Sequence, residues 1–178
     1  MTDWSLDVSL DTYWENDWKP EFVGTLMFIV SNDEILLINK KTGHGAGKIN
    51  GPGGKLHEGE RVVACAVRET EEETGLIPLD AWCALEMRFV ERQGPQWLGF
   101  ACLASAYRGQ LRETDEADPF WCPLTEIPYA QMWPDDSIWL PKILARSEGE
   151  PLVADFLFED GQLLDSAWRN ESSIASRI

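Results

Sequence analysis

The sequence predicts a single α+β domain in which strands and helices form a layered sandwich. Strand-like apolar runs recur along the chain between short turns, as in hairpins, whereas only two segments have helical periodicity. The 178 residues, of which 44% are hydrophobic, can bury one sizeable core but hardly two. A doubly wound parallel sheet is not expected, because its strands would alternate regularly with helices.

The chain begins with an acidic segment that has no clear periodicity. Residues 1–20 are interpreted as a loosely docked extension or an additional edge element. The apolar runs Phe22–Val30 and Ile35–Ile38 then predict two strands, joined by the turn-forming residues 31–33. A flexible loop is expected next, because glycine recurs at Gly43, Gly45 and Gly47.

Helical periodicity appears between Glu60 and Thr74. Small apolar residues recur there at intervals of three and four and form a narrow stripe that can pack on a sheet: Val63, Ala66, Val67 and Thr70. Gly75 stands where a glycine commonly ends a helix. We therefore predict a helix over residues 60–74.

The second half of the chain is expected to add five strands and one helix. The strands are predicted at residues 84–90, 97–104, 120–122, 152–158 and 163–168. The last two form a hairpin around Asp160-Gly161, and the helix, Pro134–Ala145, begins with a proline and two aspartates. One domain is therefore expected at 21–170, followed by a short tail at 171–178.

The charge of the chain limits its partners. Its 31 acidic and 15 basic residues give a formal charge of −16, so nucleic acid and anionic membranes are not expected to bind. A small phosphorylated substrate remains compatible, because divalent ions held by carboxylates reverse the local sign. No basic segment precedes an apolar run at the start, and no run is long enough to span a bilayer, so a cytoplasmic location is expected.

Cysteines, histidines and tryptophans show no spacing that indicates a metal site or a disulfide framework. The four cysteines are widely spaced and expected to be reduced, with Cys65 and Cys102 in the core. His44 and His57 lie beside glycines and are interpreted as surface residues. Core positions are expected for Trp97, Trp121 and Trp139.

The predicted helix at 60–74 has an acidic face beside its apolar stripe. Glu69, Glu72 and Glu73 fall at i, i+3 and i+4, where like charges repel unless a cation compensates them. Hard carboxylate oxygens suit Mg²⁺ or Mn²⁺, and Arg68 can reach Glu72 one turn later. Taken alone, a cluster of glutamates on a helix is usually a solvated face and is weak evidence for a metal site.

The wider spacing favours the metal interpretation. Gly54, Glu60, the pair Arg68-Glu69, the pair Glu72-Glu73 and Gly75 stand at the fixed positions of a pattern that resembles the Nudix box. The one departure is Thr70, where the pattern has an aliphatic residue. Thr70 is small and β-branched and can still pack there.

The resemblance implies a fold and a chemistry. The fold is the Nudix α/β/α sandwich with a mixed, curved sheet, in which a loop-helix-loop presents a pyrophosphate to divalent metal. The cofactor is expected to be Mg²⁺, with Mn²⁺ as an alternative. Catalytic roles are expected for Glu69, Glu72, Glu73, Glu116 and Arg68, and metal contacts for those four glutamates and Gly53. Glu60 supports the cluster, whereas Glu71 is expected to be exposed and outside the site.

The resemblance extends beyond the box, over about residues 23–168. The stretches 40–47, 50–55 and above all 132–141 resemble the members of this superfamily that hydrolyse oxidised purine nucleoside triphosphates. By that resemblance Trp133 stacks on the base, and Asn50, Asp135 and Asp136 bond its edge. Further substrate contacts are implied for Thr25, Lys40, Gly53, Gly54 and Met87.

A physical reason supports the role of the aspartate pair. Two adjacent, partly dry carboxyls beside an indole resist double ionisation, so that one donates a hydrogen bond while the other accepts one. Such a pair could read a purine edge that carries both carbonyl and amino groups. The alternative is simple capping, since Pro-Asp-Asp-Ser is favourable at a helix start. The resemblance of the surrounding stretch favours the pocket role.

The expected activity is hydrolysis of nucleoside triphosphates to nucleoside monophosphate and pyrophosphate. Oxidised purines such as 8-oxo-dGTP are the expected substrates, and the role would be sanitation of the nucleotide pool. Two alternatives stay open: another Nudix activity, on ADP-ribose, dinucleoside polyphosphates or unmodified dNTPs, and a nucleotide-sensing domain without catalysis. The intact carboxylates oppose the second. The sequence does not determine the oligomeric state.

Overall fold

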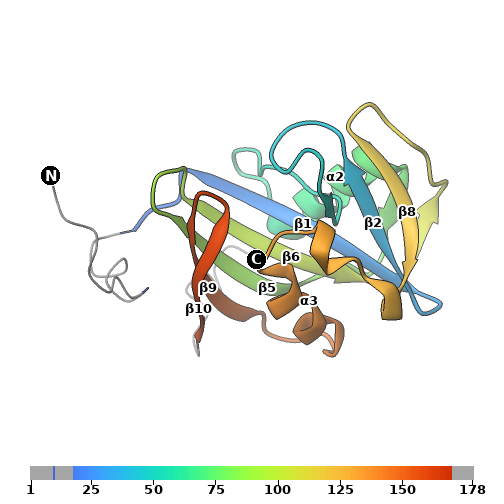
Figure 1. The fold of residues 1–178 in the computed structure, drawn as a ribbon. Coiled ribbons are helices and arrows are strands. Elements are labelled where there is room, and N and C mark those ends of the chain that lie inside the picture. The colour runs from blue at the N-terminus through green and yellow to red at the C-terminus, as the bar shows by residue number, and fades with distance from the viewer. Residues whose placement is uncertain (1–9, 11–17, 170–178) are drawn as a thin grey trace, which may run out of the picture.

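One mixed sheet organises the computed structural model, which describes residue 10 and residues 18–169. Its order is β10-β9-β5-β6-β1-β2-β3, and β8 pairs with the free side of β2 (Figure 1). The strands are β1 (Phe22–Ser31), β2 (Glu34–Lys40), β3 (Ile49–Asn50), β5 (Trp82–Glu91), β6 (Trp97–Ala104), β8 (Ala117–Pro123), β9 (Leu152–Glu159) and β10 (Gln162–Arg169). The pairs β1-β6 and β5-β9 are parallel and the others antiparallel, which confirms the mixed sheet.

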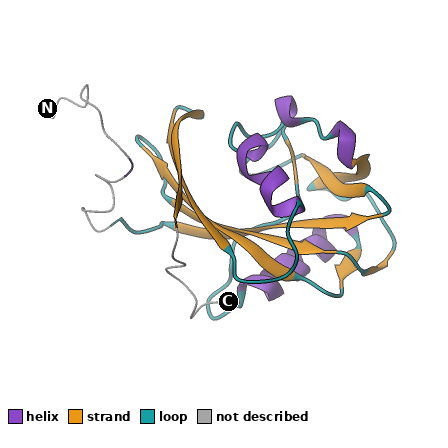
Figure 2. Ribbon diagram, turned by 90° about the horizontal axis from the view of Figure 1, so that it is seen from below, coloured by secondary structure: helices purple, strands orange, loops and turns teal. Residues whose placement is uncertain are grey.

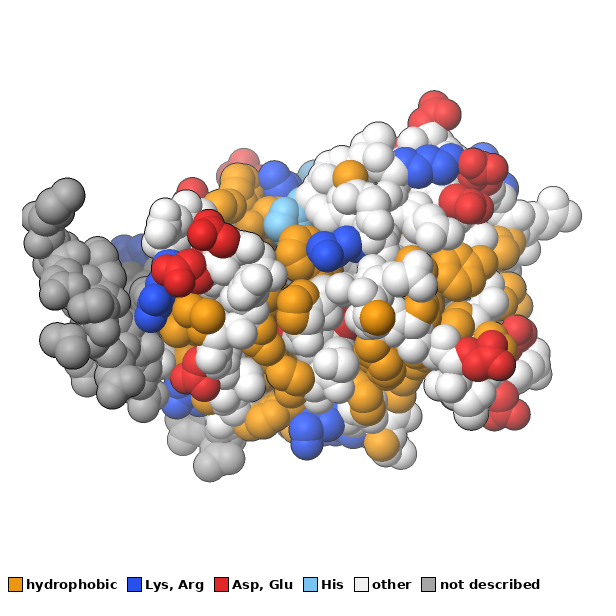
Figure 3. Space-filling model, viewed as in Figure 1, with side chains coloured by type: hydrophobic (Ala, Val, Ile, Leu, Met, Phe, Trp, Pro, Cys, Tyr) orange, Lys and Arg blue, Asp and Glu red, His pale blue; other side chains and the backbone are white. Residues whose placement is uncertain are grey.

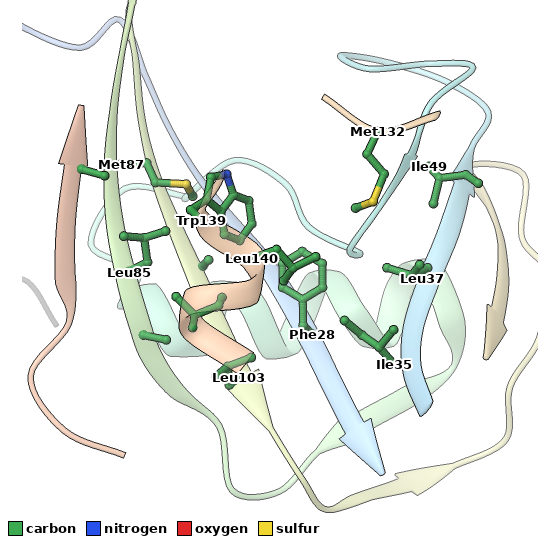
Figure 4. Close-up of a cluster of buried hydrophobic side chains, with 14 of the residues drawn as sticks. Phe28, Ile35, Leu37, Ile49, Leu85, Met87, Leu103, Met132, Trp139 and Leu140 are labelled. Atoms are coloured by element: carbon green, nitrogen blue, oxygen red, sulfur yellow. The ribbon is translucent and has the colours of Figure 1, made fainter. Parts of the chain in front are cut away.

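Helices cover both faces of this sheet. Figure 2 shows them on either side of the strands. Alternate residues of β1 point to opposite faces, so Met27 packs in the cluster that contains residues of α2 (Val62–Thr74), and Phe28 packs in the cluster that contains residues of α3 (Asp136–Leu144). In Figure 4, Trp139 and Leu140 of α3 lie against Phe28. The predicted α/β/α sandwich is confirmed.

Two hairpins turn as the sequence predicts. Asn32 and Asp33, between β1 and β2, have positive φ angles of 52° and 62°, and Asp160 and Gly161, between β9 and β10, have 51° and 75°. Two consecutive residues with positive φ are typical of the tight turn whose twist matches that of the paired strands. Asparagine, aspartate and glycine tolerate this conformation best, which explains why these turns were recognisable.

The helices are shorter than predicted, and the shortest elements were missed. Helix α2 begins at Val62 rather than at residue 60 and ends at the expected cap, Gly75, whose φ is 78° and whose N–H donates to the carbonyl of Glu71. Helix α3 covers Asp136–Leu144 rather than 134–145. The missed elements span two or three residues, too few for a periodic pattern: β3, β4 (Leu76–Pro78), β7 (Tyr107–Gly109), and the 3-10 turns η1 (Leu124–Glu126) and η2 (Tyr129–Gln131).

The remaining expectations about composition can be compared with the structure. All four cysteines are free, and the expected burial of Cys65 and Cys102 is confirmed; Cys83 and Cys122 are buried as well. Within the described ranges, no helix is both long enough and apolar enough to cross a membrane. The predicted tail at 171–178 and most of the predicted extension at 1–20 lie outside the described residues, although Leu10 packs with Val90 and Leu157 of the sheet.

Candidate active site

The site begins where β1 separates from β2. These two strands pair only at the turn, through residues 30–31 of β1, which leaves the middle of β1 open on that side. The loop of residues 51–56 takes this place, because the N–H groups of Thr25 and Met27 donate to the carbonyls of Gly54 and Pro52, each at 2.8 Å. A Cβ atom on Gly53 would lie 1.9 Å from the carbonyl oxygen of Thr25. Glycine is therefore required for the loop to lie this close to β1.

Helix α2 brings two carboxylates to the same loop. Glu73 accepts a hydrogen bond from the N–H of Gly53 at 3.0 Å and forms an ion pair with Lys40 of β2, while its side chain is only 1% exposed. The carboxylate of Glu69 fills the space beside Gly54, where a Cβ atom would lie 2.3 Å from its carboxyl carbon. Burial raises the pKa of Glu73, and the bond from Lys40 opposes this rise.

Arg68 orients the acidic cluster, but through other partners than expected. Its guanidinium binds both oxygens of Glu60, at 2.8 and 2.9 Å, and one oxygen of Glu69 at 2.6 Å. The predicted bond to Glu72 is longer, at 3.3 Å, because Glu72 lies on the solvent side with a side chain 59% exposed. The hydrogen bonds from Arg68 lower the pKa of Glu60 to about 2, so Glu60 stays charged and holds the arginine in place.

The chemistry of this cluster suits a divalent cation. Glu69, Glu72 and Glu73 supply hard oxygens on one side of α2, and two of them touch the glycine loop. In the described part of the chain, no three acidic, cysteine or histidine side chains form a ready cation cage, since Arg68 and Lys40 hold the carboxylate oxygens. The three glutamates fit a divalent cation by the type and position of their oxygen atoms. Arg68 and Lys40 compete with the cation for these oxygens. Glu71 is exposed, as expected.

A cavity of about 460 Å³ continues from this loop across the α3 face of the sheet. At one end it is lined by Lys40, Gly53, Gly54 and Glu116, and further along by Asn50, Met87 and the residues before and within α3. Figure 3 shows this side of the molecule, with hydrophobic side chains gathered across the middle and acidic ones mainly toward the two sides. No residue of α2 lines the cavity itself, but Lys40, Gly53 and Gly54, which contact Glu73 and Glu69, do, so the predicted base pocket extends to the residues that contact the carboxylate helix.

Two buried aspartates lie in this cavity where α3 begins. Asp135 and Asp136 are 3% and 2% exposed. Asp135 accepts the indole N–H of Trp139 at 2.8 Å, and Asp136 accepts the backbone N–H of Trp133 at 2.9 Å. Neither bond caps α3, whose first residues receive no side-chain hydrogen bond from Asp135, so the capping interpretation is wrong. The carboxylates are held by indole and backbone donors and face the cavity.

Burial and mutual repulsion alter the ionisation of this pair. Burial raises the pKa of Asp135 to about 6, and burial together with the charge of Asp135 raises the pKa of Asp136 to about 8. Because the two groups interact, these values describe the pair rather than separate residues. At neutral pH the pair therefore holds about one proton, as the sequence-based argument requires.

Aromatic side chains form one wall of the cavity. Trp133 is stacked on His44 with ring centroids 5.1 Å apart and an interplanar angle of 14°, and His44 is also stacked on Trp97 at 4.9 Å and 25°. The ammonium of Lys48 lies 4.8 Å from the centre of the Trp133 ring. His44 is exposed but is not a simple surface residue, and Trp97 is a wall residue rather than core. Trp139 is fully buried, as expected.

The other predicted substrate residues are distributed unevenly around the cavity. Met87 and Asn50 line it, and Asn50 accepts a hydrogen bond from the N–H of Gly51 at 2.8 Å. Glu116 is exposed at the end near Lys40. Thr25 also lines the cavity, but its hydroxyl lies 3.3 Å from the sulfur of Cys65, on the α2 side of the sheet.

Sequence reasoning missed several wall residues, among them His44 and Trp97, and did not predict that the buried Trp139 also lines the cavity. Trp97 stands on β6 and Trp139 on α3, and they reach one cavity only through the folding of distant segments. Tryptophan is common both in cores and in ligand pockets, so residue type alone could not separate the two. The glycines beside His44 indicated that the backbone of its loop can approach another group closely. They did not indicate which residues that group belongs to.

Comparison with known proteins agrees with these observations. The family model described as "NUDIX domain" matches residues 20–143. The chain is 34% identical to the oxidized purine nucleoside triphosphate hydrolase of Mus musculus over 137 residues, which cover 76% of this chain and 86% of the relative. It is 39% identical to the protein of the same name from Danio rerio over 124 residues, which cover 68% and 79%.

Solved structures share the fold. The mutator MutT protein from Bacillus halodurans superposes with a TM-score of 0.72 at 24% identity, covering 85% of this chain and 99% of that one. The MutT Nudix hydrolase from Burkholderia pseudomallei superposes with a TM-score of 0.56 at 32% identity, covering 62% and 88%. With the box residues gathered at one loop and helix, these matches lead to one conclusion: the chain belongs to the Nudix family of hydrolases, which generally require a divalent metal ion.

Proposed function

We propose that the protein is a Mg²⁺-dependent nucleoside triphosphate diphosphatase that prefers oxidised purines such as 8-oxo-dGTP. Its products are the nucleoside monophosphate and pyrophosphate, and its role is sanitation of the nucleotide pool. The catalytic domain corresponds to residues 21–170. The two relatives from mouse and zebrafish carry the name of this activity, which supports the proposal at the level of substrate class.

One observation carries this proposal: a single cavity runs from the aspartate pair to Lys40, Gly53 and Gly54, the residues that contact Glu73 and Glu69 of helix α2. Lys40 and Gly54 line the cavity near α2, and Trp133 and Asp136 line it near α3. A nucleotide has the matching polarity, with a diphosphate at one end and an aromatic base at the other. Its phosphates would meet the acidic helix only through cations, since bare carboxylates repel them.

The residues near α2 bind and orient the diphosphate end. A divalent ion held by Glu69, Glu72 and Glu73 would supply positive charge that stabilises the phosphate oxygens during attack by water. Gly53 and Glu116 are further oxygen donors in this proposal. Arg68 fixes Glu69 by hydrogen bonding, as partners of metal ligands commonly do. Lys40 neutralises Glu73 and offers its ammonium to the phosphates when the ion takes its place.

The residues near α3 bind the base. Trp133 provides a stacking surface, and Asn50 with the aspartate pair provides donors and acceptors for the base edge. The protonated carboxyl donates to a carbonyl oxygen of the purine, and the ionised one accepts from its N–H or amino group. A site that bonds polar groups in this way rejects bases that leave its buried carboxyls unpaired.

The test is a pyrophosphate-release screen of the purified protein with Mg²⁺, with Mn²⁺ and with chelator. The substrates are 8-oxo-dGTP, dGTP, dCTP, 8-oxo-dGDP, ADP-ribose and a dinucleoside polyphosphate, with chromatography of the products. We expect the largest kcat/KM for 8-oxo-dGTP and no turnover in chelator. A preference for ADP-ribose or a dinucleoside polyphosphate would reject the substrate class but leave the Nudix chemistry intact. Turnover that is unaffected by chelator would reject the metal assignment.

A further inference from the structure

Three rings from distant parts of the chain form a stack on the cavity wall. His44 lies between Trp97 and Trp133, with centroids 4.9 and 5.1 Å away and interplanar angles of 25° and 14°. All three residues line the same cavity as Asp135 and Asp136. The near-parallel arrangement of the imidazole on the Trp133 indole is the geometry that a flat base would adopt on that ring.

The loop that carries His44 is largely exposed, and none of residues 41–48 belongs to the two large core clusters. Gly43 and Gly45 flank His44 with φ angles of 73° and 84°, and Gly47 follows with 86°. A Cβ atom on Gly43 or Gly47 would contact nothing within 4 Å, whereas one on Gly45 would lie 3.3 Å from the indole nitrogen of Trp133, so the loop lies against the Trp133 ring and is open elsewhere. Among the described residues, the His44 imidazole has ring contacts but no hydrogen bond that would anchor it.

The ionisation of His44 fits its place between two indoles. Partial burial against the rings, with the positive charges of Lys55 and Lys40, lowers the pKa of His44 below its usual value. The neutral imidazole, which can stack as an apolar ring, is therefore favoured. The ring contacts stabilise the arrangement in which His44 covers the Trp133 indole.

We propose that His44 fills the stacking place on Trp133 in the free protein and must leave it before a nucleotide base can bind. This inference rests on the base site proposed above. The free protein then divides between a closed form, with His44 stacked, and an open form that accepts the base. The measured affinity is the affinity of the open form multiplied by its population.

A plug of this kind has a distinctive consequence. Removing the imidazole by His44→Ala increases the population of the open form, so nucleotides bind more tightly, by about tenfold if the ring contacts have ordinary strength. The gain is the same factor for every base, because the contacts that are lost belong to His44 itself. A residue that stacks on the base would have the opposite effect: its removal weakens binding and changes the ranking of bases.

Binding of product nucleotides tests the inference without turnover. Titration calorimetry with dGMP and 8-oxo-dGMP, in chelator, compares the wild type with His44→Ala, Trp133→Ala and the control His57→Ala. His57 is exposed and does not line the cavity, so its removal should leave the dissociation constants unchanged. We expect His44→Ala to lower both constants by a similar factor and Trp133→Ala to raise both.

Proton NMR provides a second measurement on the unaltered protein. The chain has 2 histidines, so the His57→Ala spectrum identifies the His44 ring signals directly. Ring currents of the two indoles shift the His44 signals strongly in the free protein. We expect this shift to collapse toward the position of a solvent-exposed histidine when dGMP is added.

The outcomes separate this inference from the proposed function. If Trp133→Ala binds both nucleotides like the wild type, the base site itself is misplaced. If Trp133→Ala weakens binding but His44→Ala also weakens it, the base site stands and His44 is a base contact rather than a plug. Unchanged affinity of His44→Ala, or ring signals that stay shifted in the complex, would likewise overturn the plug.

Discussion

At the scale of single residues, the catalytic assignment depends most on Glu73. It is the one carboxylate of the box that is almost fully buried, and it is also bonded to both the glycine loop and Lys40. Burial of a carboxylate is unfavourable unless a cation or several donors compensate it. The burial and contacts of Glu73 support its proposed catalytic role, whereas Glu71 lies on the exposed side of the same helix.

The substitution Glu73→Gln should abolish turnover and preserve the fold. Glutamine keeps an oxygen for the Gly53 N–H but loses the negative charge, so we expect kcat to fall at least about 100-fold, the upper end for loss of a residue that merely supports a ligand. The melting temperature should change little. Glu71→Gln, on the same helix, is the matched control and should remain active. Near-normal kcat in Glu73→Gln would contradict the metal assignment.

The aspartate pair predicts a pH-dependent affinity for purines. With pKa values of about 6 and about 8, the pair holds one proton between these limits and is doubly ionised above them. We expect KM for a purine nucleotide to rise as the pH passes about 8, because the donor is lost. In Asp136→Asn the amide remains a donor, so this alkaline rise should disappear. Asp118→Asn, at an exposed position of β8, should retain it.

The same pair affects stability with a definite sign. Both pKa values are raised in the folded protein, so these groups favour folding at low pH, and this contribution is lost as the pH rises toward about 8. Asp136→Asn should therefore flatten the fall of the melting temperature between about pH 4 and about pH 8, the window between the unfolded and the folded pKa of this group. A fall as steep as that of the wild type would show that Asp136 does not titrate there.

At the scale of elements, the adjacent glycines Gly53 and Gly54 have different structural roles. A Cβ atom on Gly53 would lie nearest to the backbone of β1, whereas one on Gly54 would lie nearest to the carboxylate of Glu69. Backbone of a central strand cannot yield, but a carboxylate can rotate away. The loop therefore lies between strand β1 and the acidic helix. Gly53 allows it to approach the strand, and Gly54 leaves space for the Glu69 carboxylate.

The substitutions Gly53→Ala and Gly54→Ala should distinguish the effect on stability from the effect on activity. We expect Gly53→Ala to lower the free energy of unfolding by about 1–3 kcal/mol, the usual cost of overpacking, as measured by urea denaturation. Gly54→Ala should change stability less but lower kcat more than about tenfold, because it displaces Glu69. Gly149→Ala, where the nearest atom would be 4.0 Å away, is the control for both. Equal losses of stability in the two variants would argue against this division.

At the scale of the whole molecule, the mixed sheet determines how far the site extends. The parallel pairing of β9 with β5 adds the C-terminal hairpin beside the wall of the cavity. Asp155 on β9 joins three strands, since it binds Arg88 of β5 at 2.6 Å and Arg169 of β10 at 2.5 Å and is itself fully buried. This triad connects strands that are far apart in the sequence.

Removal of the central carboxylate tests this connection. Asp155→Ala leaves two arginines without their shared partner, and because both are partly exposed we expect a loss of about 1–3 kcal/mol, below that of a fully buried pair. Glu159→Ala, on the same strand, removes a looser pair at 3.4 Å and should cost less than about 1 kcal/mol. Urea denaturation measures both. A similar, small effect of the two substitutions would mean that the triad contributes little.

The sequence by itself determined the local features, because each depends on residues close together in the chain. It predicted the long strands, the two tight turns, the helix with Gly75 at its end and the acidic face with Glu69 and Glu73. The spacing of the box also predicted the family, since its residues occupy one loop and one helix. Strands of two or three residues were not predicted, because so few residues cannot show a periodic pattern of hydrophobicity.

Only the tertiary structure decided which distant residues share the cavity. Contacts such as Lys40 with Glu73, Arg68 with Glu60, and His44 between Trp97 and Trp133 depend on how the sheet brings separate strands and loops together. It also rejected the capping role of Asp135, whose partner is the indole of Trp139. The spacing of residues along the chain determines which functional groups a segment carries. Burial and interaction partners arise only when distant segments pack together. Burial and partners in turn determine which side chains are charged, which are held in place and which can move.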